Sequence, residues 1–112
     1  VKIDHLIKWM SENYNSDISL ETMATYIGCS PAYTSKLFKK ETGCDIITYL
    51  SGLRIEHAKE LLCTTQITIA EVAAFVGFNN QQTFIRNFKK LTGLTPTEYR
   101  SLPDGLHISE ES

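Results

Sequence analysis

The chain has 112 residues, of which 42% are hydrophobic and 21% are charged, a composition typical of a folded domain rather than a disordered chain. Its length suits one ordinary domain or two very small ones that share an interface. No apolar run approaches the roughly 18 residues that a membrane helix needs, and the N-terminus is amphipathic rather than signal-like. Because the chain does not begin with Met, we expect it to be a piece of a longer protein.

The net charge of −2 argues at first against a nucleic-acid partner, but the distribution of charge matters more than its total. Three of the acids, Asp104, Glu110 and Glu111, lie in the C-terminal tail, and the remaining chain has 11 basic and 10 acidic residues. The positive charge is concentrated in two segments, 28–43 and 77–93, and the second of these contains no acid.

The cysteines argue against a metal site. Cys29, Cys44 and Cys63 are 15 and 19 residues apart, so no pair has the C-x-x-C spacing of zinc ligands. We expect three small, buried thiols in a reducing cytosol and no cofactor.

The first predicted helix spans residues 2–13. Its apolar residues recur at i, i+3, i+4 and i+7, which gives one buried face, made by Ile3, Leu6, Ile7 and Met10.

A helix-turn-helix is predicted immediately afterwards. Ser19 is placed to cap a short helix, and Gly28 suits the left-handed position that ends one. Ser30 and Pro31 then start another helix, as its N-cap and first helical residue. Two helices joined by so short a turn form the helix-turn-helix pattern, and the small side chain of Ala24 lets them approach closely.

The segment 77–93 repeats the segment 28–43, and both end in Phe-Lys-Lys-x-Thr-Gly. The offset between the copies is 49 residues before the turn and 50 after it. A repeat that occurs only twice indicates a duplication rather than a solenoid.

The second copy has the same signals. Thr68 and Glu71 form a capping box, Gly77 ends that helix, and Asn79 or Asn80 caps the next. Agreement in apolar pattern, cap, glycine and following helix predicts a second helix-turn-helix.

A long helix is predicted between the copies, from Ile46 to about Leu62, with Asp45 as its cap. Gly52 costs roughly 1 kcal/mol relative to Ala in a helix, which suggests close packing there, and Arg54 is expected to be a half-buried salt-bridge partner. The inner face is predicted to follow Ile47, Leu50, Arg54, Ala58, Leu61 and Leu62.

The last predicted helix opens with Pro96, inside a capping box from Thr95 to Glu98, and runs to Leu102. The residues after Gly105 are expected to form a frayed tail.

The second helix of each copy has one apolar and one polar face. Thr34, Leu37 and Phe38 are predicted to face the core in the first copy, and Phe84, Phe88 and Leu91 in the second. The opposite faces carry small polar, amide and cationic residues, which is what a helix needs to read the major groove. A polar stripe on one helix is usually only a solvated surface; two such helices in matched frames favour DNA binding.

These residues resemble the C-terminal DNA-binding domain of the AraC/XylS transcription regulators. The resemblance covers about residues 3–102. It rests on Ser30-Pro31-x-Tyr33-x-Ser35-Lys36-Leu37-Phe38-Lys39-Lys40-x-Thr42-Gly43, Leu53-Arg54-Ile55-Glu56-x-Ala58-Lys59-x-Leu61-Leu62, Ile69-x-Glu71-Val72-Ala73-x-x-Val76-Gly77-Phe78, and Phe84-x-Arg86-x-Phe88-Lys89-Lys90-x-Thr92-Gly93-x-Thr95-Pro96-x-Glu98-Tyr99-Arg100.

The resemblance implies an all-α fold of seven helices, with two helix-turn-helix subdomains joined by a long central helix. Their recognition helices are expected to enter adjacent major grooves of double-stranded DNA. The corresponding ranges are 1–45 for the first subdomain, 46–63 for the linker helix, 64–103 for the second subdomain and 104–112 for the tail.

The resemblance also assigns roles by position. The expected base contacts are Ala32, Tyr33, Ser35, Lys36, Gln81, Gln82, Ile85 and Arg86. Lysines later in each helix are expected to meet phosphates, which gives affinity without sequence information; these are Lys39, Lys40, Lys89 and Lys90. Because Ala32 offers little beyond contact with a thymine methyl, we expect the second helix to discriminate more strongly.

The implied protein is a bacterial, cytoplasmic regulator that acts with RNA polymerase, without a membrane partner. Segment 18–43 and residues Arg54 to Glu56 look most like the output domains of AraC-type two-component response regulators, whose receiver domain would lie upstream. The acidic balance leaves open a helical protein-interaction module that has lost DNA binding. An enzyme is not expected, because no nucleophile with a base, paired acids or metal set occurs.

Overall fold

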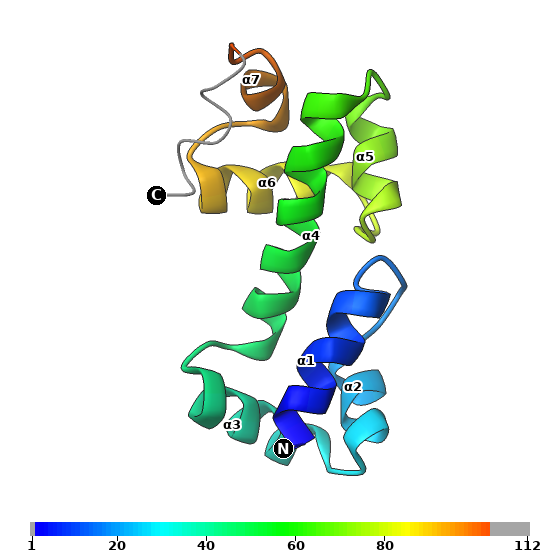
Figure 1. The fold of residues 1–112 in the computed structure, drawn as a ribbon, viewed down its shortest axis with the longest axis vertical. Helices are drawn as coiled ribbons and strands as arrows, with labels where there is room; N and C mark the ends of the chain where they lie inside the picture. Colours follow the sequence, from blue (N-terminus) through cyan, green and yellow to red (C-terminus); the bar gives the residue numbers. More distant parts are fainter. Residues whose placement is uncertain (1, 104–112) are drawn as a thin grey trace. The chain divides into compact units, whose positions relative to one another are not determined.

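The computed structural model describes residues 2–103, and this part of the chain contains seven helices and no strand (Figure 1). The predicted all-α architecture is confirmed. The helices are α1 (Lys2–Asn13), α2 (Leu20–Ile27), α3 (Pro31–Thr42), α4 (Ile46–Thr64), α5 (Ile69–Phe75), α6 (Gln81–Thr92) and α7 (Pro96–Arg100). The predicted tail after Gly105 lies outside the described residues.

The chain forms two compact units, Val1–Arg54 and Ile55–Ser112, here called the first and the second unit. The boundary falls inside α4, so this helix contributes residues to both units.

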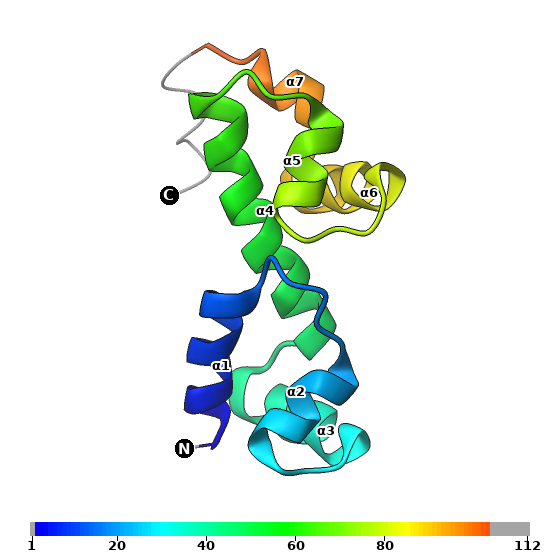
Figure 2. The ribbon, with the colours of Figure 1, turned by 90° about the vertical axis from the view of Figure 1, so that its right-hand side faces the viewer.

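The core of the first unit lies among α1, α2, α3 and the start of α4, and Figure 2 shows the first three packed beside one another. Ile46 is 1% exposed whereas Ile47 is 47% exposed, so the predicted inner face of α4 was wrong at its first position. Asp45 accepts hydrogen bonds from the N–H groups of Ile47 and Thr48 at the start of α4. Ile46 packs in the core together with Leu50, which lies one turn later on the same face. The buried residues are Ile3, Leu6, Met10, Met23, Phe38, Ile46 and Leu50.

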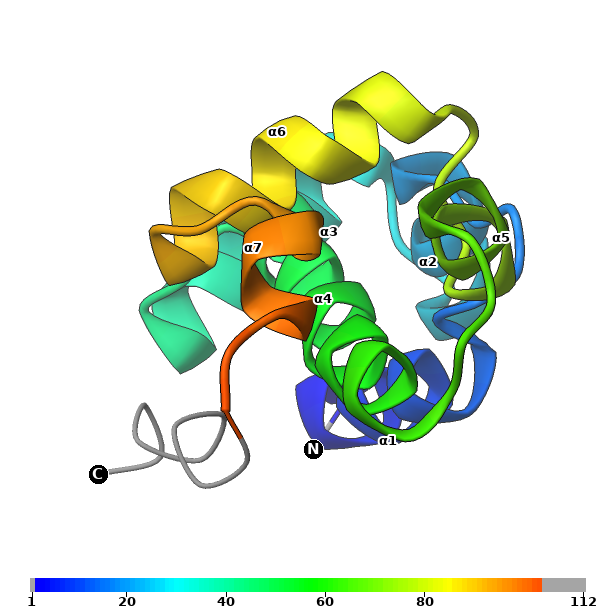
Figure 3. The ribbon, with the colours of Figure 1, turned by 90° about the horizontal axis from the view of Figure 1, so that it is seen from above.

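A continuous row of aromatic rings runs through the core of the second unit. Phe84 lies 5.4 Å from Phe78 and 5.7 Å from Phe88, and Phe88 lies 5.4 Å from Tyr99 of α7 (ring centroids). Figure 3 shows α7 beside α6, which is the arrangement that this last ring pair stabilises.

Leu91 was predicted to face this core, but it is 44% exposed. The inner face of α6 continues instead in four-residue steps from Phe84 and Phe88 to Thr92, whose hydroxyl donates to the carbonyl of Phe88 at 2.8 Å. A hydroxyl that satisfies its hydrogen bond within the helix can take an inner position at low cost, which leaves Leu91 outside.

The short turns before α3 and α6 use the same hydrogen bonds. Gly28 has φ 73°, a conformation that glycine adopts without steric penalty. Just past it, the N–H of Cys29 donates to the carbonyl of Ala24 at 3.0 Å. In the second unit the N–H of Phe78 donates to the carbonyl of Ala73 at 2.9 Å. Both predicted helix-turn-helix motifs therefore form with one turn geometry.

The N-caps predicted for α2, α3, α5, α6 and α7 were correct, whereas the C-cap of α5 is Val76 and not the predicted Gly77. Ser19, Ser30, Thr68 and Thr95 each accept a backbone N–H, and of the two candidates before α6 the cap is Asn80. Both predicted capping boxes are present.

The equivalence of the two units extends to the segments that follow α3 and α6. The hydroxyl of Thr42 donates to the carbonyl of Phe38 at 2.8 Å and accepts the N–H of Cys44 at 3.1 Å. Thr92 makes the same pair of bonds with Phe88 and Leu94, at 2.8 and 3.1 Å. Residues that are 50 positions apart in the repeat therefore make the same hydrogen bonds.

Arg54 is half-buried, as predicted. Its guanidinium donates to the carbonyls of Tyr14 at 2.7 Å and Ser16 at 3.0 Å, so it ties α4 to the loop that follows α1. Burial lowers the pKa of Arg54, and the nearby carboxylate of Asp17 opposes this shift.

Two expectations about small residues were wrong. A Cβ atom built on Gly52 would have no neighbouring heavy atom within 4 Å, so this glycine does not mark close packing. The cysteines are not buried: Cys29 and Cys44 are half-buried and Cys63 is exposed. Cys29 lies in a turn, Cys44 in a loop and Cys63 on the outer side of α4. Their exposure follows from these positions rather than from the apolarity of the side chain.

Candidate nucleic-acid interface

In the first unit, α3 buries one face and exposes the other. Thr34 and Phe38 are fully buried, and the hydroxyl of Thr34 is satisfied by the carbonyl of Ser30 at 2.8 Å. Tyr33 is 53% exposed, and the cap bond from its N–H to the Ser30 hydroxyl fixes the first turn. Of the four predicted base-facing residues, Ala32, Tyr33 and Lys36 are exposed and Ser35 is half-buried.

In the second unit, α6 has the same pattern of exposure. Phe84 and Phe88 are fully buried, and the N–H of Thr83 donates to the Asn80 side chain at 2.8 Å. The amide of Asn87 is held within the helix by the carbonyl of Thr83. Of the predicted base-facing residues, Gln81, Gln82 and Arg86 are exposed and Ile85 is half-buried.

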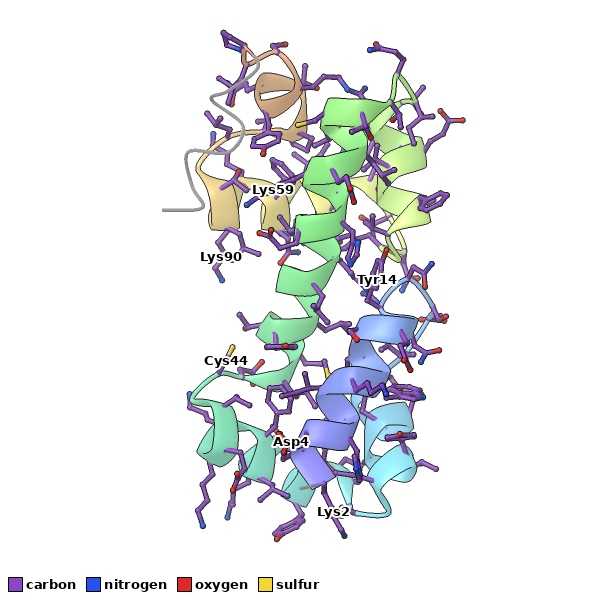
Figure 4. All side chains as sticks on the ribbon, in the orientation of Figure 1. Lys2, Asp4, Tyr14, Cys44, Lys59 and Lys90 are labelled. Atoms are coloured by element: carbon purple, nitrogen blue, oxygen red, sulfur yellow. The ribbon has the colours of Figure 1, made fainter. Side chains whose placement is uncertain are left out.

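The four lysines predicted to meet phosphates lie in the last turns of the two helices. Lys39 and Lys40 of α3 and Lys89 and Lys90 of α6 are all exposed, and Figure 4 shows Lys90 projecting away from α6. Cations at this end of a helix are favoured by the helix dipole. Each unit by itself therefore brings its four candidate base-facing residues and two lysines onto one helix.

No three His, Cys, Asp or Glu side chains among residues 2–103 are grouped so that they could hold a metal ion. None of the described helices combines the length and apolarity that crossing a membrane requires.

A protein-family model described as a helix-turn-helix domain matches residues 23–101, which include all of the second helix-turn-helix motif and all but the first turn of the first. The chain belongs to the AraC-type helix-turn-helix family.

Individual proteins agree with this assignment. The AraC-type chain is 37% identical over 102 residues to the F1 operon positive regulatory protein of Yersinia pestis, covering 90% of this chain. It spans only between 13% and 34% of the length of the curated regulators that it matches first.

Solved structures give the same fold. The C-terminal domain of AraT, a response regulator from Geobacillus stearothermophilus, superposes with a TM-score of 0.86 at 31% identity, covering 93% of this chain and 89% of that one. The DNA-binding domain of AdpA, solved in complex with a target DNA, superposes with a TM-score of 0.84 at 23% identity, covering 96% and 94%.

Sequence reasoning missed one feature of this AraC-type domain. Tyr26 on α2 and Phe75 on α5 are 48% and 60% exposed, although an aromatic ring gains most from burial. The two residues are 49 positions apart, which is the repeat offset before the turn, so a search of the repeat for matched aromatic residues would have found them.

Proposed function

We propose that this chain binds double-stranded DNA in a sequence-specific manner and serves transcription regulation. α3 and α6 are its two recognition helices, and they enter adjacent major grooves, which lie roughly 34 Å apart along the duplex. The observation that carries the proposal is the matched exposure of α3 and α6. Each is the second helix of a helix-turn-helix motif, and equivalent positions of the two helices are buried or exposed alike. Family membership and the DNA-bound AdpA domain support it.

The base contacts are assigned to the exposed stripes at the start of each helix. Arg86 suits a bidentate contact to guanine, and Gln81 and Gln82 suit adenine. In α3, Lys36 reaches guanine or a phosphate, whereas Ala32 offers only a methyl group for contact with thymine. We therefore assign more of the sequence discrimination to α6 and more of the anchoring to α3.

The phosphate contacts are assigned to Lys39, Lys40, Lys89 and Lys90. A lysine is a compact point charge that strengthens binding to every sequence equally and makes affinity depend on salt. These four lysines are a small basic set within an acidic chain, so we expect weak non-specific affinity.

We also propose a context for the domain. The likeness to the AraT output domain supports a two-component response regulator whose receiver domain lies upstream. Such a regulator acts on RNA polymerase in the bacterial cytoplasm, without catalysis of its own.

Selection of bound duplexes from a random pool, followed by footprinting, tests the proposal. We expect one asymmetric site of roughly 15 to 20 base pairs, because the two helices differ in sequence. Failure to bind any duplex even at low salt would instead favour a protein-interaction module.

Two substitutions separate reading from anchoring. Arg86→Ala should cost about 1 to 3 kcal/mol on the selected site and relax the preference at one base pair. Lys89→Ala should weaken all sequences alike and lower the salt slope by about one. Lys8→Ala, at an exposed position of α1, is the matched control and should change neither quantity.

A further inference from the structure

The two exposed rings, Tyr26 and Phe75, have different surroundings. Tyr26 stacks on Trp9 of α1, with the ring centroids 5.0 Å apart and the planes inclined by 22°. Phe75 is 60% exposed. The residue that corresponds to Trp9 lies on the helix that takes the place of α1 in the second unit.

That helix is the end of α4. Its buried residues have the same spacing as those of α1, at i, i+3 and i+7, as shown by Ile3, Leu6 and Met10 in α1 and by Ile55, Ala58 and Leu62 in α4. The offset of 52 residues makes Leu61 the equivalent of Trp9.

A pair of hydrogen bonds supports this equivalence independently. The side chain of Asn13 donates to the carbonyl of Trp9 at 2.8 Å, and the hydroxyl of Thr65 donates to the carbonyl of Leu61 at 2.6 Å. Both donors stand four residues after the carbonyl that they contact. The second unit therefore has a leucine where the first unit has the indole that stacks on its exposed ring.

The result is an open apolar groove between α4 and α5, of about 560 Å³, lined by Leu61, Thr65, Ile67, Glu71, Ala74 and Phe75. The first unit has a hollow of about 400 Å³ beside its stacked rings, but His5, Lys8 and Glu12 line it together with Trp9 and Tyr26. The groove of the second unit is therefore distinguished by its apolar lining, in which Leu61 takes the position of Trp9.

The groove has one charged residue on its rim. Glu71 is exposed, and its carboxylate accepts the N–H of Thr68 at 2.8 Å. This bond lowers its pKa, so it is ionised at neutral pH. The six lining residues include no base, and an occupant that carries a cation next to its apolar side chain would complement them.

We propose that the α4–α5 groove receives an aromatic side chain from a helical segment of a partner protein, with Lys or Arg one turn away placed beside Glu71. The first unit supplies the template for the contact, because the ring of Trp9 stacks on that of Tyr26. The groove lies on the side of α5 formed by residues 71, 74 and 75, and it includes none of the residues assigned to DNA, so protein and DNA binding are separable.

A designed helical peptide is the direct probe. An alanine-based peptide with one Trp and one Arg four residues apart, so that both lie on one face, is titrated into the ¹⁵N-labelled chain. We expect saturable shifts at Leu61, Ala74 and Phe75, and none with the peptide in which Trp is replaced by Ala. Absence of saturation at millimolar peptide overturns the proposal.

Substitutions on the protein give the matched comparison. Phe75→Ala should weaken the peptide about tenfold or more, as truncation of an aromatic anchor does. Leu91→Ala, which removes another exposed apolar side chain of the same unit, should leave the affinity unchanged. Equal effects of the two substitutions contradict a specific site.

Leu61→Trp tests the template itself. The introduced indole should stack on Phe75 and show ring-to-ring nuclear Overhauser contacts. It should abolish peptide binding and leave DNA affinity unchanged. The two measurements together therefore show whether the groove and the DNA-binding helices act separately. If the groove signals instead shift with protein concentration in the absence of peptide, and Leu61→Trp suppresses this shift, the occupant is a second copy and the partner proposal is wrong.

Discussion

Thr42→Val should destabilise the first unit although it changes neither side-chain shape nor β-branching. The hydroxyl of Thr42 accepts the N–H of Cys44 at 3.1 Å and donates to the carbonyl of Phe38 at 2.8 Å. Valine keeps the volume but leaves that N–H without its acceptor. An unsatisfied, buried polar group costs about 1 to 3 kcal/mol. Because Thr42 is half-buried and water can partly replace the hydroxyl, we expect about 1 to 2 kcal/mol.

Urea unfolding followed by fluorescence measures this loss from within the first unit, because Trp9 is the only tryptophan of the chain. With a urea dependence of about 1.5 kcal/mol per molar, the transition midpoint should fall by about 1 M. Thr48→Val, at an exposed position in the first turn of α4, is the matched control and should shift it much less.

The repeat supplies a second, independent measurement. Thr92→Val removes the equivalent bonds to Phe88 and Leu94, and the ring signals of Tyr99 report unfolding of the second unit. The two losses should agree within a few tenths of a kcal/mol, as for sites in one environment. If Thr42→Val were no more destabilising than Thr48→Val, the idea that this hydroxyl holds the end of the recognition helix would be refuted.

Four further substitutions test the contacts that hold the helices in place. Glu71→Gln should make stability depend less on pH in the acid range. Because the pKa of Glu71 is lowered in the folded chain, the stability that its carboxylate contributes is present above the ordinary value of 4.5 and is lost as the pH falls below it. Thermal unfolding between pH 3 and pH 7 measures this loss. Gly93→Ala should lower the free energy of unfolding by about 1 to 2 kcal/mol, because φ at this position is +87°. Gly52→Ala, inside α4 with open space around it, should raise it by up to about 1 kcal/mol in the same urea assay. Arg54→Lys should lower the Trp9 midpoint, since an ammonium cannot reproduce the forked contact to two carbonyls, and an unchanged midpoint would contradict it.

The helix boundaries could be predicted because the signals that set them are local. A cap needs only one side chain and the N–H group two or three residues later, so Ser30, Thr68 and Thr95 were assigned from sequence alone. The left-handed turn at Gly28 is local in the same sense. The exposure of the α3 and α6 stripes was also predictable, because helical periodicity determines which residues share a face. Contact of those stripes with DNA stays a prediction.

The errors lie where packing between helices decides. Ile46 and Ile47 are adjacent and equally apolar, so periodicity does not determine which of them turns inward; packing against the other helices of the first unit does. Leu91 and Thr92 pose the same problem, and the hydroxyl of Thr92 could take the inner position because it bonds within its own helix. Cys63 was expected to be buried from residue type alone, but the phase of α4 leaves it exposed.

The duplicated frame makes each unit a control for the other. Residues that hold the helices in place, such as Thr42 and Thr92, make the same contacts in both copies. A position where the copies differ is therefore not needed for these shared contacts. Two sets of differences stand out: the base-facing stripes, and the exchange of Trp9 for Leu61. The first set gives the two helices different base preferences. The second gives the groove beside Phe75 an apolar lining, whereas the hollow beside Tyr26 is lined also by His5, Lys8 and Glu12. A requirement for stability alone does not explain an apolar lining next to an exposed ring, because burying the ring of Phe75 would add apolar contact, and this is why we assign the groove to a partner.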